Sequence, residues 1–156
     1  MIDFLVAAAL ALASAPPAGA DQAEEQIYQV RSDDAAMNAA IAEGRRTLPS
    51  FYRRLAAPQA GDGEFMVKFD IDPSDQFEYV WAVSLDRSGS PMTGILINQP
   101  VNTSDRPGDR VAIPEASIID WGYRAGRVMQ GNFTNRVLLG QMAPEDAAEY
   151  RRFLGW

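Results

Sequence analysis

The chain has 156 residues, of which 47% are hydrophobic and 22% are charged, so its composition is that of a globular domain rather than a disordered chain. A net charge of −7 argues against nucleic acid as a partner, because surfaces that bind nucleic acid are basic. The chain has no cysteine and no histidine, which excludes disulfides, thiol nucleophiles, Ser-His-Asp triads and the usual zinc ligand sets.

The first twenty residues have the layout of a secretory signal peptide. An apolar run interrupted only by Asp3 is followed by small residues at Ala18 and Ala20. The run is shorter than the roughly 20 apolar residues that span a bilayer, and no later segment is as apolar. We therefore expect cleavage after Ala20 and a periplasmic or secreted protein without a membrane span, with an uncleaved anchor as the alternative because Lys and Arg are missing near Asp3. The expected organisation is a signal peptide, a leader and a single domain, at residues 1–20, 21–31 and 32–156.

Helical periodicity begins after the leader. Ser32 or Asp33 can cap a helix, and the apolar residues that follow recur on one helical face. Pro49 is unsuited to a helix interior but suits a first turn, so we predict that the first helix ends there and a second occupies residues 49–57. Two basic pairs lie on these helices and are interpreted as solvated, with anion binding as the alternative: Arg45, Arg46, Arg53 and Arg54.

Strict alternation of apolar and polar residues predicts strands from residue 65 onward. Lys68, the only lysine, falls on the polar side of the first strand and is predicted to be solvated. The expected strands are residues 65–71, 77–85, 92–98, 111–113, 118–123 and 127–130. A helical pattern follows at 133–139, and Pro144 with two acids opens a last helix.

This order of elements predicts an α+β fold. Hairpin-length connections favour an antiparallel sheet of five or six short strands, with the helices before and after it packed on the sheet. Because the strands are short and interrupted by glycine, curling into a small open barrel is an alternative to an open sheet.

Six sequence blocks occur in the order seen in one bacterial family. They are AIAEGRRTLPSF, FMVKFDI, GILINQPV, GDRVAIP, IIDWGY and GNFTNRVL. The chain resembles the domain-of-unknown-function 2314 (YegJ-like) family over about residues 33–142. It departs from the family pattern at Gly122, where members usually carry Met, and at Asn132, where members usually carry a second Gly. The resemblance implies an α+β fold and a small envelope or cytosolic protein, and it carries no catalytic residue over to this chain.

Carboxylates are the residues that remain for catalysis or metal binding. Glycoside cleavage by a pair of acids needs no histidine, and the candidates are Glu78, Asp86, Glu115 and Asp120. A divalent-ion site at the acidic turn would use Asp70, Asp72, Asp75 and Glu78, but an EF-hand is excluded because Asp75 replaces its glycine and Trp81 its final Glu. We favour a simple acidic turn, and expect no catalytic residue, no metal and no cofactor.

Aromatic residues provide the best candidate binding surface. Trp121 and Tyr123 share one face of a predicted strand and can anchor a peptide or a glycan, although core packing is the alternative. Their expected polar neighbours are Arg124, Arg127, Asn98 and Asn132.

The preferred function is therefore a secreted or periplasmic, non-catalytic binding module for a protein or a cell-wall component. Within this class we favour an immunity or inhibitor-type protein, because an acidic domain can neutralise a basic partner through complementary charge. The alternatives are a carboxylate-dependent glycan hydrolase and a structural envelope protein without a discrete site.

Overall fold

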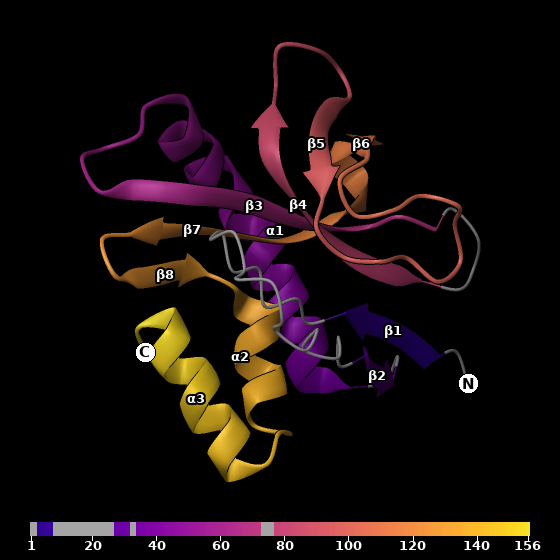
Figure 1. Cartoon of the computed structure of the whole chain (residues 1–156), viewed down its shortest axis with the longest axis vertical. Helices are drawn as coiled ribbons and strands as arrows, with labels where there is room; N and C mark the ends of the chain where they lie inside the picture. Colours follow the sequence, from indigo (N-terminus) through magenta and orange to yellow (C-terminus); the bar gives the residue numbers. More distant parts are fainter. Residues whose placement is uncertain (1–2, 8–26, 32–33, 73–76) are drawn as a thin grey trace, which may run out of the picture.

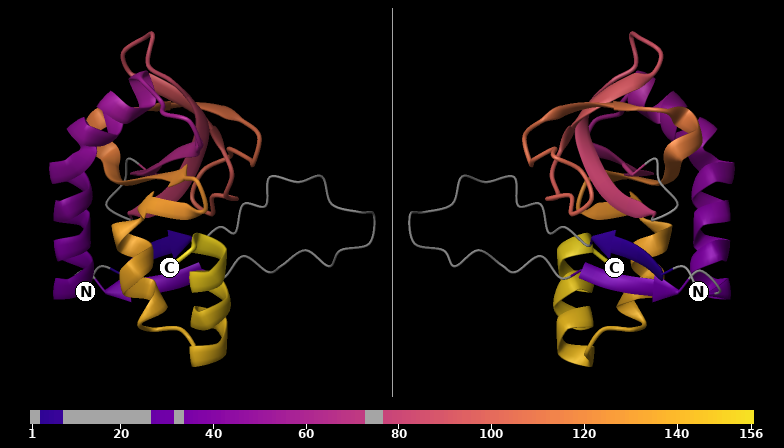
Figure 2. Two further views of the ribbon diagram at one scale, coloured as in Figure 1. Left: turned by 90° about the vertical axis from the view of Figure 1, so that its left-hand side faces the viewer. Right: turned by 90° about the vertical axis from the view of Figure 1, so that its right-hand side faces the viewer.

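The computed structural model describes residues 3–7, 27–31, 34–72 and 77–156 (Figure 1). The described strands form one sheet, and the helices pack beneath and beside it (Figures 1 and 2). The elements in chain order are β1 (Asp3–Ala7), β2 (Ile27–Arg31), α1 (Ala35–Ala56), β3 (Asp62–Asp70), β4 (Glu78–Asp86), β5 (Met92–Leu96), β6 (Arg110–Ile113), the 3-10 helix η1 (Glu115–Ser117), β7 (Ile118–Ala125), β8 (Val128–Gly131), α2 (Phe133–Leu139) and α3 (Pro144–Leu154).

The sheet is curled into a half-barrel, as Figure 2 shows. Its strands run in the order β2-β1-β4-β3-β7-β8, and β5 and β6 branch from β4. Every pair from β3 to β8 is antiparallel, whereas β1 pairs with β4 in parallel. Glu64 and Ser84 have positive φ at two of the register shifts, and such bulges increase the local twist. The predicted α+β fold, with helices packed on a curled antiparallel sheet, is confirmed.

The strands β1 and β2 belong to the N-terminal region. They lie within the segments expected to be signal peptide and leader, and they pair with each other along their full length. Cleavage after Ala20 stays a prediction. Within the described ranges, no helix has the length and the hydropathy needed to cross a membrane.

The first helix differs from its prediction at both ends. Asp34, not Ser32 or Asp33, caps α1, because its carboxylate accepts hydrogen bonds from the backbone amides of Ala36 and Met37. The predicted break at Pro49 is wrong, since α1 continues through this residue to Ala56. Pro49 removes only one backbone hydrogen bond, and the continuous packing of the turns around it holds both halves against the sheet. The helix bends toward its C-terminal end (Figure 2), as expected near an internal proline.

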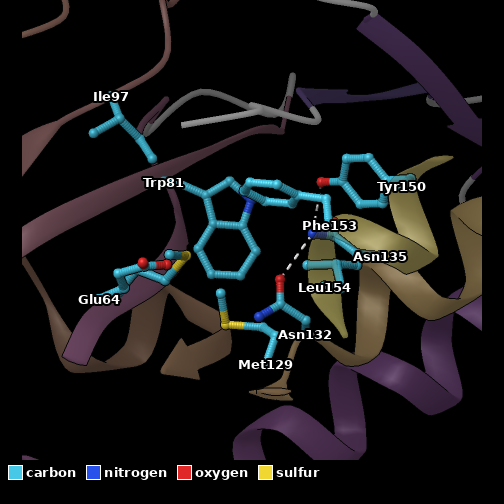
Figure 3. Close-up of a pocket in the computed structure, with 10 residues that line it drawn as sticks. Glu64, Trp81, Ile97, Met129, Asn132, Asn135, Tyr150, Phe153 and Leu154 are labelled. Carbon is cyan, nitrogen blue, oxygen red and sulfur yellow. Dashed lines mark hydrogen bonds between the residues drawn. The ribbon is translucent and has the colours of Figure 1, made fainter. Parts of the chain in front are cut away.

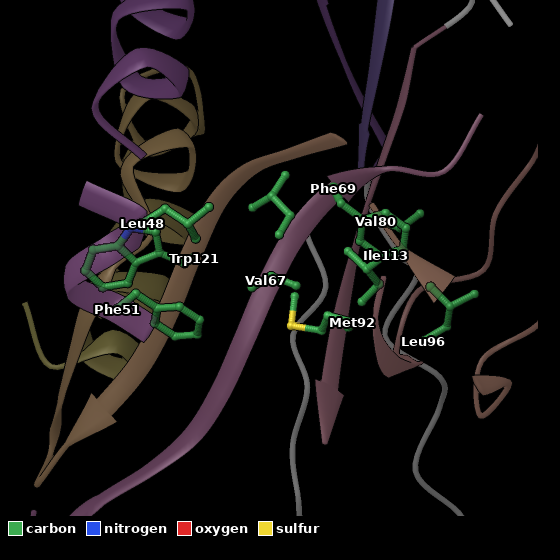
Figure 4. Packing of buried hydrophobic residues seen from close by; sticks show 11 residues of the cluster. Leu48, Phe51, Val67, Phe69, Val80, Met92, Leu96, Ile113 and Trp121 are labelled. Carbon is green, nitrogen blue, oxygen red and sulfur yellow. The ribbon is translucent and has the colours of Figure 1, made fainter. Parts of the chain in front are cut away.

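A close contact between α1 and β7 organises the core. The indole nitrogen of Trp121 donates hydrogen bonds to the carbonyl oxygen of Gly44, at 3.1 Å, and to Thr47 Oγ1, at 3.0 Å. A side chain at position 44 would collide with the carbonyl oxygen of Ile119, so only glycine allows the helix to lie this near the strand. Phe51 stacks on Trp121, with 5.3 Å between ring centroids, and the main cluster spreads from there across the sheet (Figure 4).

The strand β3 is covered on both of its faces. Val67 and Phe69 belong to the main cluster with Leu48 and Phe51 of α1. The intervening Lys68 faces α2 and is 0% exposed. The prediction of a solvated Lys68 is therefore wrong, because the helices that follow the sheet in sequence pack over the face that the alternation marked as polar.

Candidate functional site

A fully buried polar cluster lies between the sheet and α2. Lys68 on β3 is the register partner of Asp120 on β7, and Thr134 lies in the first turn of α2. Lys68 Nζ donates to Thr134 Oγ1 at 3.4 Å, and the Thr134 hydroxyl donates to Asp120 Oδ2 at 2.7 Å. Asp120 also accepts from the backbone amides of Thr134 and Trp121. The cluster is a chain of hydrogen bonds from amine through hydroxyl to carboxylate.

Burial dominates the electrostatics of this cluster. It lowers the pKa of Lys68 from 10.5 to about 8, although the charge of Asp120 opposes the shift. It also raises the pKa of Asp120, against the hydrogen bonds from Thr134 and the charge of Lys68. The ring of Trp81 lies 5.4 Å from Lys68 Nζ and provides a further favourable contact for the cation.

Perturbed pKa values of this kind often mark catalytic groups. A lysine of lowered pKa beside a hydroxyl also has the composition of a nucleophile and its base. Here, however, Lys68, Asp120 and Thr134 are each 0% exposed. The cluster therefore joins α2 to the sheet and offers no access to a substrate.

A small, partly open cavity lies near this cluster. Asn132 and Asn135 at the start of α2 border it, together with Trp81 and Met129 of the sheet and Tyr150 of α3 (Figure 3). Asn132 has a left-handed backbone (φ 54°), and its Oδ1 accepts a hydrogen bond from Asn135 Nδ2 at 2.8 Å. The cavity has a volume of about 20 Å³, which is too small for any organic ligand.

A surface groove with a volume of about 440 Å³ lies beside the loop between β4 and β5. The Arg87 guanidinium lies 3.5 Å from the centre of the Tyr52 ring, and Glu115 lies beside the same tyrosine. Burial, and then the charge of Glu115, raise the pKa of Tyr52 to about 12, whereas Arg87 lowers it. The groove-lining residues are Tyr52, Arg87, Gly89, Ser90, Pro91, Met92, Ile113, Pro114 and Glu115.

The strand β6 forms one side of this groove and is an edge strand. Within the described sheet it pairs only with β5, and Ile113 at its end lines the groove. The amide of Leu96 donates to the carbonyl oxygen of Asp109 at 2.9 Å, so Asp109 faces β5. Backbone groups alternate along a strand, so Val111 faces β5 and the backbone of Ala112 faces outward. An unpaired strand edge and a groove therefore meet at one place.

A second, more open depression of about 310 Å³ lies beside Tyr123. Arg53 and Arg54 border it, but Arg54 pairs with Asp62 and Arg53 donates to Ser50 Oγ at 2.8 Å. Both cations thus have partners on the protein surface, which leaves less charge for an anion.

The six residues of the predicted binding surface lie in several different environments. Trp121 is in the main core, at 8% exposure, and stacks on Tyr123 with 6.1 Å between ring centroids. Tyr123 is half-buried and reaches the second depression. Asn98 is buried and accepts from the amide of Trp81, while Asn132 borders the small cavity.

The two arginines of that set lie near the C-terminal helix. Arg124 pairs with Glu64 at 2.9 Å and lies 5.3 Å from the centre of the Phe153 ring. Arg127 is exposed in the turn before β8. The structure therefore brings Trp121 and Tyr123 together on one strand face, as predicted, but it does not gather the six residues around one concave surface.

The candidate catalytic carboxylates do not converge. Glu78 and Asp86 end the same strand and lie about 26 Å apart, at about 3.3 Å per residue, whereas glycoside cleavage needs acids roughly 10 Å apart or less. Glu78 instead accepts hydrogen bonds from the backbone amides of Val101 and Asn102. Asp120 is sealed in the buried cluster, and Glu115 borders the groove.

The proposed divalent-ion site is only partly described, because Asp75 lies outside the described residues. The carboxylate of Asp70 accepts hydrogen bonds from the backbone amides of Asp72 and Glu78, so it binds the backbone on both sides of the turn. Among the residues that the structure describes, no three acidic side chains gather in a way that could hold a metal ion.

The groove residues Tyr52, Arg87 and Glu115 were not predicted as a group. They come from α1, the loop after β4 and η1, and no local pattern connects these segments. The buried cluster did leave a signal, since Asp120 interrupts the apolar run Ile118, Ile119 and Trp121. An acid between such neighbours indicates a buried carboxylate, and a buried carboxylate needs a partner.

Comparisons with known proteins agree on one family. The chain is 27% identical to "Uncharacterized protein YegJ" of Escherichia coli (strain K12) over 135 residues, which cover 86% of this chain and 87% of that protein. No solved structure matches the chain. The family model described as "Uncharacterized protein conserved in bacteria (DUF2314)" matches residues 34–156, from the cap of α1 to the last residue. The chain therefore belongs to the DUF2314 family of bacterial proteins.

Proposed function

We propose that the protein is a non-catalytic, periplasmic or secreted binding module that holds an extended segment of a partner protein in the groove beside β6. The observation that carries this proposal is the meeting of an unpaired strand edge with a groove of about 440 Å³. An edge strand can pair with an added strand through backbone hydrogen bonds, and a neighbouring pocket then selects its side chains. The signal-peptide layout of the first twenty residues supports export.

The groove has the chemistry to select side chains. The exposed Arg87 and Glu115 carry opposite charges and both contact Tyr52, while Met92 and Ile113 supply an apolar floor. A segment with both apolar and charged residues satisfies these groups together. The net charge of −7 favours encounter with a basic partner, which is the behaviour expected of an immunity or inhibitor-type protein.

A glycan hydrolase is less well supported by the same geometry. Glu115 is the only carboxylate among the residues that line the groove, whereas two acids are needed to cleave a glycosidic bond. The groove therefore has the parts for binding but not for this hydrolysis.

The edge can be blocked without disturbing the sheet. Ala112 is exposed, and its backbone faces away from β5, so Ala112→Pro removes an outward amide and no bond of the ladder. Arrays of short basic, neutral and acidic peptides, together with soluble cell-wall fragments, serve as probes. We expect binding of a subset of the basic peptides and a loss of at least about tenfold with Ala112→Pro or with Glu115→Ala. Glu149→Ala, on the exposed face of α3, is the matched control and should bind normally.

Three outcomes would refute the proposal. Peptide binding that is unaffected by Ala112→Pro would exclude the edge of β6 as the docking site. Binding of cell-wall fragments alone would replace the protein partner with a glycan. Absence of binding to every probe would favour a structural envelope protein.

A further inference from the structure

Two residues that border the small cavity each carry a buried polar atom without a hydrogen-bond partner among the described residues. These are Asn132 Nδ2, a donor, and Asn135 Oδ1, an acceptor. The two residues are 2% and 3% exposed, and both border the cavity. An unpaired buried polar atom destabilises the folded protein, so two beside one small cavity call for a ligand.

The chemistry of the two atoms defines that ligand. A cation would leave the amide donor unpaired, an anion would leave the carbonyl acceptor unpaired, and an apolar molecule would satisfy neither. Only a small molecule that both donates and accepts can serve both atoms. The cavity volume of about 20 Å³ fits one water, which needs at least ~10–15 Å³ on the same measure. We propose that one water molecule is bound in this cavity by Asn132 Nδ2 and Asn135 Oδ1.

The inference does not depend on how the two amides are oriented. As described, Asn135 Nδ2 donates to Asn132 Oδ1. If both amide groups are turned over, Asn132 Nδ2 donates to Asn135 Oδ1, and one acceptor and one donor again remain unpaired. Either arrangement leaves the pair of groups that a single water can join.

The position of this water gives it a structural role. Asn132 and Asn135 open α2, Tyr150 belongs to α3, and Trp81 and Met129 belong to the sheet, so the cavity lies where three parts of the fold meet (Figure 3). The water adds to the direct hydrogen bonds of this junction, where Thr134 of α2 donates to Asp120 of the sheet and Asn135 Nδ2 donates to the Tyr150 hydroxyl of α3 at 3.5 Å.

A high-resolution crystal structure of the full chain tests the proposal directly. We expect density for one water within hydrogen-bond distance of both amide groups. In solution, nuclear Overhauser cross-peaks between water and the side-chain amide protons of Asn132 should show a long-lived bound water. Both signals should be lost in Asn135→Leu, which removes the acceptor at nearly constant volume. Glu149→Ala, on the exposed face of α3 and outside the cavity lining, is the control variant, and it should keep the water because both asparagines remain.

The proposal is overturned by ordered asparagines around a cavity without density, or by cross-peaks that persist unchanged in Asn135→Leu. If Asn135→Leu does not fold, the wild-type density and cross-peaks decide alone, because their absence is sufficient to reject the bound water.

Discussion

Replacing Lys68 with methionine should remove most of the alkaline pH dependence of the protein's stability. Burial lowers the pKa of this lysine from 10.5 to about 8, with Asp120 opposing the shift. The unfolded chain therefore holds the proton more tightly than the folded protein, and the charged lysine costs folding free energy below about pH 8. That cost disappears as the pH rises from about 8 to 10.5, so stability should increase across this window.

The expected size follows from the two pKa values. Their difference corresponds to about 3 kcal/mol, most of which falls between pH 7 and pH 10. With a urea m-value of about 2 kcal/mol per molar, the unfolding midpoint should rise by about 1 M. Measurement should stop at pH 10, because the pKa values of Tyr52 and Tyr79 are raised to about 12 and their ionisation in the unfolded chain reverses the trend.

Urea unfolding followed by tryptophan fluorescence, at intervals from pH 7 to pH 10, measures this effect. The wild-type midpoint should rise, and that of Lys68→Met should stay nearly constant. Met66→Leu, two residues away on the same strand, controls for repacking and should keep the rise. A flat wild-type curve would refute the reasoning, as would a Lys68→Met variant that still gains stability. If Lys68→Met does not fold, the wild-type curve alone remains a sufficient test.

Three further predictions concern packing and the groove. Gly44→Ala should lower the free energy of unfolding by about 1–3 kcal/mol, because the added methyl group meets the Ile119 carbonyl. Gly63→Ala is the control, because nothing lies within 4 Å of a methyl group at that position. Equal losses of stability in denaturant unfolding of the two variants would contradict the close contact at Gly44. Gly122→Ala should cost a similar amount, since its methyl group displaces the Asn132 amide. Adding Asn132→Gly should then cost less than in the wild type, and strict additivity in a double-mutant cycle would count against the collision. In an ultraviolet titration, Tyr52→Phe should remove one phenol with a pKa of about 12. Glu115→Gln should lower the pKa of Tyr52, because it removes a negative charge beside the phenol. An unchanged titration of Glu115→Gln would show that Glu115 does not act on Tyr52.

Local patterns predicted most elements of this fold. Alternation located β3 and β4, and Pro144 with its acidic neighbours marked the start of α3. These signals depend on residues a few positions apart, so they can be recognised without knowledge of the tertiary packing. Pro49 shows their limit, because burial of the neighbouring turns against the sheet overrides the local preference for a helix end.

The candidate site was much less predictable. The alternation of apolar and polar residues assigned Lys68 to a solvated face. This pattern describes a single strand and carries no information about which helices pack on that strand. The helix that covers Lys68 contributes Thr134, which is 66 residues away in the chain. In the same way, the sequence placed Trp121 and Tyr123 on one strand face, but it did not indicate that Trp121 is buried in the core whereas Tyr123 is only half-buried.

The sequence by itself determined which chemistries are absent, where most strands and helices lie, and to which family the chain belongs. Composition, period and ordered sequence blocks are properties of the chain that exist before folding. Only the tertiary structure decided that Lys68 joins Thr134 and Asp120, and that Tyr52 meets Arg87 and Glu115 beside the free edge of β6. These groups come from distant segments, and their meeting depends on the bulges that curl the sheet and on the close approach of α1 at Gly44.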